Sequence, residues 1–118
     1  MGTVLFVYGT LKRGERNHRL IADQRFLGPA VSAPKYRVLD LGPHPGLIPD
    51  ANEGLSIAGE LWDVSNCTLE ELDDFEGLPD LFDRRVIELI GESQSVQAYF
   101  WVRAIPKGVA SGARWPLR

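Results

Sequence analysis

The stretch TVLFVYGTLKRGERN, from Thr3 to Asn17, decides how we expect this chain to fold. Its first half, Val4 to Tyr8, is an unbroken apolar and aromatic run rich in β-branched residues, which predicts a strand buried on both faces. The run stops at Gly9, and Gly14 follows further along. Glycine adopts positive φ or allows another group to approach the backbone closely. The stretch therefore predicts a buried strand that opens into a glycine-flanked loop.

The loop between the two glycines has the character of an anion-binding site. Thr10 supplies a hydroxyl, and Lys12 and Arg13 supply positive charge. Free backbone N–H groups at the rigid end of a buried strand suit a carboxylate or a developing oxyanion. A phosphate-binding Walker A loop is excluded, because Glu15 and Arg16 stand where its lysine and its Ser/Thr are required. An ordinary strand and β-turn with solvated basic side chains is the alternative interpretation.

Composition indicates an ordinary globular protein. The 118 residues predict a single domain, 1–118, whose residues 104–118 form an irregular tail without hydrophobic periodicity, held by Trp115. Apolar residues make up 44% and charged residues 25%, as in soluble proteins. The net charge of −3 argues against non-specific nucleic-acid binding, and no run has membrane-spanning length.

The cysteine and histidine content argues against a metal site. Cys67 is the only cysteine, so an intrachain disulfide is impossible and a structural zinc site would lack thiolate ligands. His18 and His44 lie far apart in the sequence and are weak evidence for a metal. We expect a cytoplasmic protein that uses no cofactor and no metal and binds neither a membrane nor nucleic acid; the oligomeric state stays open.

The remaining patterns predict a mixed α+β fold. Thr68 and Glu71 fit a capping box for a helix that runs to about Glu76 and is stopped by Gly77 and Pro79. The last predicted strand is apolar on both faces, which favours a small central β-barrel of mostly antiparallel strands with the one main helix packed at its side. We expect helical turns over 17–23, a rigid Gly- and Pro-rich loop over 41–49, strands over 25–31, 36–41 and 57–64, and an antiparallel hairpin over 84–103.

One acidic side chain of the predicted helix lies on its apolar face. On a helical wheel Glu76 returns to within about 20° of Leu69, on the side where Leu72 also points. Partial burial and the carbonyl end of the helix would both raise the pKa of this carboxyl group, and a carboxylate tuned in this way is a competent general base. Alternatively, the helix end frays and Glu76 turns into water or pairs with Arg84 or Arg85.

Several motifs in matching order resemble one family. They are YGTLKRG at 8–14 followed by Asn17 and His18, GPHPGLIP at 42–49, GELWDV at 59–64, LDDFEG at 72–77 and LFDRR at 81–85. Together they resemble the γ-glutamylcyclotransferase-like superfamily, in particular its γ-glutamylamine cyclotransferase branch. The chain departs from the pattern at Phe82 and Trp101, where relatives often have tyrosine, and by one more residue between Gly112 and Trp115 than in the bacterial Gly-x-Trp ending.

The resemblance implies both a reaction and the residues that carry it. The family's YG(S/T)L loop matches Tyr8, Gly9, Thr10 and Leu11, which would hold a γ-glutamyl unit, and its catalytic glutamate matches Glu76. The implied reaction is intramolecular attack of the γ-glutamyl α-amino group on its own side-chain carbonyl. It releases 5-oxoproline and a free amine or amino acid, with Glu76 as general acid and base.

Two other classes of function stay open at this point. A non-catalytic module that binds a small carboxylate would use the same loop but would gain nothing from a base at Glu76. A phosphate or nucleic-acid patch would use the basic residues Lys12, Arg13, Arg16 and Arg19, although the net charge disfavours it. Within the enzyme class the leaving amine is not determined: lysine from a proteolysed crosslink, another amino acid, a polyamine or a secondary metabolite all fit.

Overall fold

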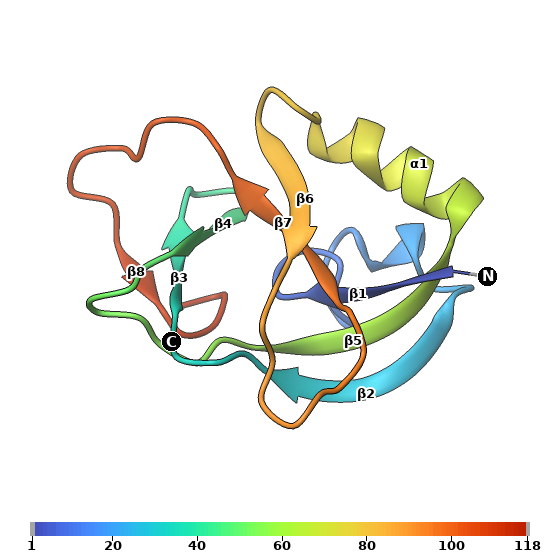
Figure 1. Cartoon of the computed structure of the whole chain (residues 1–118). Coiled ribbons are helices and arrows are strands. Elements are labelled where there is room, and N and C mark those ends of the chain that lie inside the picture. The colour runs from blue at the N-terminus through green and yellow to red at the C-terminus, as the bar shows by residue number, and fades with distance from the viewer. Residues whose placement is uncertain (1, 118) are drawn as a thin grey trace.

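The computed structural model describes residues 2–117, so Met1 and Arg118, the ends of the predicted domain and tail, lie outside the described residues. Within residues 2–117, one α-helix and one short 3₁₀-helix accompany eight strands (Figure 1). In chain order the elements are β1 (Gly2–Val7), η1 (His18–Leu20), β2 (Arg25–Val31), β3 (Tyr36–Asp40), β4 (Pro45–Pro49), β5 (Ala58–Ser65), α1 (Asn66–Glu76), β6 (Phe82–Val86), β7 (Gln97–Trp101) and β8 (Ser111–Gly112).

The predicted central strand is confirmed. β1 lies inside the sheet, whose order is β2-β5-β1-β7-β4-β3-β8, with β6 paired to β7 beside this path. Leu5 and Val7 belong to one apolar cluster and Phe6 to a second one, so both faces of β1 are covered. The helix α1 packs over β1 and β5 on one of these faces (Figure 1).

The prediction of a mostly antiparallel, closed barrel is wrong. β1 and β4 both pair with β7 in parallel, so the sheet is mixed. Its first and last strands, β2 and β8, do not pair with each other within residues 2–117, so the sheet does not close. Alternate residues of β7 are buried on two sides because separate clusters cover the two faces of this sheet: Ala98 and Phe100 belong to one cluster, Tyr99 to the other. Two-sided burial therefore does not require closure.

The arrangement around β7 positions the site. β6 pairs along the whole of β7 from Phe82↔Trp101 to Val86↔Gln97, which confirms the predicted hairpin and occupies one edge of β7. β1 and β4 consequently share the other edge, β1 beside Gln97 and β4 beside Phe100. The chain after β1 and the start of β4 thus come together near the middle of β7.

Three local predictions need correction. The N-cap of α1 is Ser65, whose hydroxyl accepts a hydrogen bond from the N–H of Thr68 at 3.3 Å, so Thr68 lies inside the helix and forms no capping box. The predicted helix over 17–23 is only the short η1, because the amide of Asn17 binds Thr10 instead of capping a helix. The predicted loop over 41–49 contains β4, which pairs along the whole of β3.

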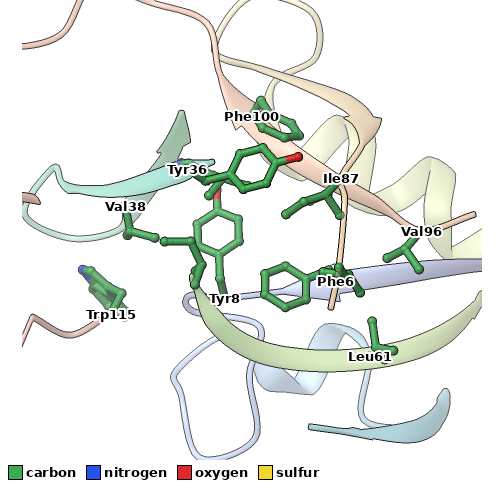
Figure 2. Packing of buried hydrophobic residues seen from close by; sticks show 13 residues of the cluster. Phe6, Tyr8, Tyr36, Val38, Leu61, Ile87, Val96, Phe100 and Trp115 are labelled. Atoms are coloured by element: carbon green, nitrogen blue, oxygen red, sulfur yellow. The ribbon is translucent and has the colours of Figure 1, made fainter. Parts of the chain in front are cut away.

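The ends of elements are closer to expectation. α1 ends at Glu76 as predicted, with Gly77 in the left-handed conformation at φ 74°. The tail is not wholly irregular, because Ser111–Gly112 pairs with β3, but Trp115 is buried in the core as expected. Figure 2 shows this core, in which Phe6 and Tyr8 lie among side chains from β3, β5 and β7.

None of the helices that the structure describes has the length and apolar character needed to span a bilayer.

Candidate active site

A cavity opens where the chain leaves β1. Its empty space of about 360 Å³ includes open solvent. All five residues singled out from the sequence line it, namely Tyr8, Gly9, Thr10, Leu11 and Glu76. The other lining residues are Phe6, Val7, His44, Pro45, Phe82 and Tyr99.

Glu76 reaches this cavity from the last turn of α1. Its carboxyl group is half-buried and makes no hydrogen bond or salt bridge within residues 2–117. The alternative pairings are excluded, because Arg84 binds Asp73 and Arg85 binds Asp83. Burial raises the pKa of Glu76 from 4.5 to about 7. The side chain is therefore a carboxyl group that exchanges a proton near neutral pH and faces a cavity.

The loop opposite Glu76 carries free hydrogen-bond donors. Gly9, Thr10 and Leu11 are buried, yet their backbone N–H groups donate to no acceptor in the part of the chain that the structure describes. Buried N–H groups are almost always paired in proteins. Three successive free ones beside a cavity form a concavity of partial positive charge, suited to a carboxylate or an oxyanion.

The two glycines of the loop are needed for different reasons. Gly14 has a φ of 86°, and a side chain there would meet open space. Gly9 has no such conformation, but a Cβ atom on it would lie 2.4 Å from Cγ of Pro45. Gly9 therefore allows the loop to pack against the first residue of β4, while Gly14 allows the chain to turn.

Tyr8 lines the cavity, and its hydroxyl is used by the scaffold. The hydroxyl donates to the carbonyl of Tyr99 at 2.7 Å and accepts from the N–H of Leu47 at 3.1 Å. Burial, and secondarily the charge of Glu76, raise the pKa of Tyr8 well above its ordinary value. The hydroxyl is consequently a fixed, protonated link between β7 and β4.

A hydrogen-bond network that the sequence did not reveal supports the opposite wall. The hydroxyl of Tyr99 donates to Asp73 at 2.7 Å, and Arg84 donates to both carboxylate oxygens of Asp73 at 3.0 and 2.9 Å. Arg84 also donates to the side-chain oxygen of Gln97. Burial would raise the pKa of Asp73, but these hydrogen bonds outweigh it and hold the pKa below its usual range. The partners of Asp73 belong to β6 and β7, so a helical wheel could not reveal them.

Aromatic side chains close the cavity on the side of β4 and β6. The rings of His44, Phe82 and Trp101 lie 5.3 to 6.0 Å apart between centroids. Phe82 has no hydroxyl, and the indole N–H of Trp101 donates to the carbonyl of Ala104 at 3.3 Å. Within residues 2–117, no three His, Cys, Asp or Glu side chains come together as a metal site would require.

Three of the four basic side chains of the loop region are engaged within the protein. Lys12 donates to the carbonyl of Trp115 at 2.7 Å, and Arg13 pairs with Glu60 at 3.3 Å. Arg19 donates to the carbonyl of Arg16 at 3.1 Å and to the side chain of Asn17. The guanidinium group of Arg16 forms no salt bridge to any described carboxylate.

Comparison with known proteins agrees with this geometry. The family described as "Gamma-glutamyl cyclotransferase, AIG2-like" matches residues 5–116. A protein of Rattus norvegicus named γ-glutamylaminecyclotransferase is 33% identical over 115 residues, which cover 85% of this chain and 77% of the relative. The human protein of the same name is 37% identical over 93 residues, covering 73% of this chain and 61% of the relative.

A solved structure extends the likeness to the fold. The crystal structure of an AIG2-like protein from Mus musculus superposes with a TM-score of 0.85 and 26% identity, covering 97% of this chain and 88% of that one. The family match spans almost the whole chain and includes the loop after β1 and the end of α1. The chain therefore belongs to the γ-glutamyl cyclotransferase, AIG2-like family, whose enzymes cyclise γ-glutamyl substrates.

Proposed function

We propose that this protein is a γ-glutamyl(amine) cyclotransferase in which Glu76 is the general acid and base. The substrate's α-amino group attacks its own γ-carbonyl carbon, the amide bond to the leaving amine breaks, and the products are 5-oxoproline and a free amine or amino acid. One observation carries the proposal: a carboxyl group with a pKa of about 7 lines the same cavity as three free backbone N–H groups.

Binding of the γ-glutamyl unit uses the loop after β1. The N–H groups of Gly9, Thr10 and Leu11 supply hydrogen-bond donors for the substrate carboxylate or for the oxyanion that forms on the attacked carbonyl. Tyr8, which lines the same cavity, contacts the apolar part of the unit. These donors are fixed by the rigid end of β1, so they need little reorganisation when negative charge develops.

Proton transfer is the task of Glu76. The substrate's α-ammonium group must lose a proton before it becomes nucleophilic, and a carboxylate with a pKa of about 7 accepts that proton more readily than an ordinary glutamate would. The same proton is then available to the departing nitrogen, which would otherwise leave as a poor, anionic leaving group. One carboxyl group thus serves both steps.

Holding the substrate in a folded conformation accounts for much of the expected rate. Nucleophile and carbonyl belong to the same molecule, so a cavity that brings them together converts the attack into a well-oriented intramolecular step. A small, partly enclosed site suits this task.

The decisive experiment measures 5-oxoproline released from a panel of γ-glutamyl amines and dipeptides. We expect Glu76→Gln to retain the fold, checked by circular dichroism, and to lose activity by roughly 10²- to 10⁴-fold, the usual contribution of a general base. Glu70→Gln on the exposed face of the same helix is the matched control and should behave as wild type. Release of 5-oxoproline by Glu76→Gln at the wild-type rate would refute the mechanism, and binding without any release by wild type would favour a carboxylate-binding module.

The pH dependence provides a second test. Because the base form of Glu76 is required, kcat/KM of the wild-type protein should rise with pH through about 7. The residual activity of Glu76→Gln should lack this rise. A cytoplasmic setting remains our prediction, which rests on the single cysteine of the chain.

A further inference from the structure

A second cavity adjoins the first at Glu76. It encloses about 410 Å³, part of it open to solvent. Its walls share Thr10, His44, Glu76 and Phe82 with the first cavity and add Arg16, Asn17, Phe75 and Leu81. The proposed acid and base therefore lies at the junction of two connected spaces.

The two cavities differ in the hydrogen-bond donors that line them, and this difference determines which part of a substrate binds in each. Gly9 and Leu11, two of the three free N–H donors, line only the first cavity. If the γ-glutamyl unit occupies that cavity, the bond that breaks lies at the junction, within reach of Glu76. The departing amine then extends into the second cavity.

The walls unique to the second cavity are apolar and positively charged. Phe75 and Leu81 expose 45% and 44% of their surface, although large apolar side chains are usually buried. Arg16 is exposed and forms no salt bridge within residues 2–117. An unpaired guanidinium group beside two exposed apolar side chains suits a ligand that has an apolar body and an anionic group.

We infer that this second cavity is the leaving-group subsite and that Arg16, Phe75 and Leu81 select amines carrying an apolar body and a carboxylate. The inference rests on the proposed function. Arg16 binds the carboxylate, while Phe75 and Leu81 cover the apolar part of the amine. A polyamine is disfavoured, because its second ammonium group would lie near the charge of Arg16.

The test compares substrates that differ only in the carboxylate. The first pair is γ-glutamyl-leucine and γ-glutamyl-3-methylbutylamide, of which only the leucine compound carries a carboxylate on its amine. The second pair is γ-glutamyl-6-aminohexanoate and γ-glutamyl-hexylamide. Here the carboxylate of the aminohexanoate lies further from the scissile bond. γ-Glutamyl-cadaverine supplies the cationic amine. We expect kcat/KM to be about three- to tenfold higher for the carboxylate member of at least one pair, and lowest for cadaverine.

Substitutions test which residues cause the preference for a carboxylate and for an apolar body in the leaving amine. Arg16→Gln should lower kcat/KM for the carboxylate member of a pair more than for its uncharged partner and so remove the carboxylate preference. Arg25→Gln, which removes an exposed charge on β2, should keep the preference. Phe75→Ala should lower kcat/KM for the amides with apolar bodies about threefold or more, whereas Ile90→Ala, an exposed residue that lines neither cavity, should not.

The outcomes separate this inference from the proposed function. Equal turnover of both members of each pair, or a carboxylate preference that survives in Arg16→Gln, would overturn the leaving-group assignment while the cyclotransferase activity stands. Absence of 5-oxoproline from every substrate with wild-type protein would overturn both.

Discussion

The hydroxyl of Tyr8 donates a hydrogen bond of 2.7 Å to the carbonyl oxygen of Tyr99, 91 residues later in the chain. The same hydroxyl accepts from the N–H of Leu47 at 3.1 Å. It therefore joins the exit of β1 to both β7 and β4.

Replacing Tyr8 with phenylalanine should lower the free energy of unfolding by about 1–3 kcal/mol, because a buried carbonyl and a buried N–H lose their partner. Tyr36→Phe is the matched control: the Tyr36 hydroxyl accepts one hydrogen bond, from Glu88 at 3.0 Å, in a partly buried place, so its loss should cost less. Urea denaturation of the two variants measures the difference. An equal or smaller cost for Tyr8→Phe would contradict the structural role assigned to its hydroxyl.

The raised pKa of Glu76 predicts that stability falls over the same pH range in which activity rises. The folded-state pKa of about 7 lies above the ordinary value of 4.5, so between these pH values the folded protein holds a proton that the unfolded chain has released. Stability contributed by this group is complete below about pH 4.5 and is lost as pH rises through 7. Above pH 7 the charged side chain should cost up to roughly 3 kcal/mol.

Glu76→Gln should therefore be more stable than wild type at high pH, by about 1–3 kcal/mol, and closer to it at acidic pH, where the wild-type carboxyl group is protonated in both the folded and the unfolded chain. Denaturation curves at both ends of the range test this, with Glu70→Gln as the control that should show no such pH dependence. A Glu76→Gln variant that matches wild type at high pH would show that the carboxylate is well solvated in the folded protein.

Much of the site could be predicted because its determinants are local in sequence. The free N–H loop follows from the apolar run before Gly9, and the direction of Glu76 follows from the phase of α1 and its end at Gly77. Each of these depends on residues within one element, where periodicity and capping rules apply.

The rest depends on pairings between distant segments. β4 could not be foreseen, because Pro45 and Pro49 sit at the ends of a strand whose interior pairs with β3, a register that composition does not disclose. The openness of the sheet was missed for a similar reason: two apolar faces look the same in sequence whether a barrel or two separate clusters cover them. The hydrogen-bond partners of Asp73 lie on β6 and β7, so the periodicity of the helix cannot predict them.

The Asp73–Arg84 pair should show strong coupling in a double-mutant cycle. Both side chains are 24% exposed and joined by two hydrogen bonds, so we expect a coupling free energy of about 1–3 kcal/mol between Asp73→Asn and Arg84→Gln. The exposed pair Arg85–Asp83 is the control and should couple by roughly 0.5 kcal/mol or less. Equal coupling in the two cycles would show that the network contributes no more than a surface ion pair.

The contact between Gly9 and Pro45 should be the most sensitive point of the cavity wall. Gly9→Ala places a methyl group 2.4 Å from the Pro45 ring, so we expect a loss of about 1–3 kcal/mol in stability and a fall in 5-oxoproline release, because the free N–H groups shift. Pro45→Ala in the same chain should restore part of both. Gly14→Ala is the control: its cost, about 1–2 kcal/mol, comes from a φ of 86° and not from contact, so Pro45→Ala should not relieve it. If the losses of stability caused by Gly9→Ala and Pro45→Ala are simply additive, the close contact between Gly9 and the Pro45 ring does not determine the position of the loop.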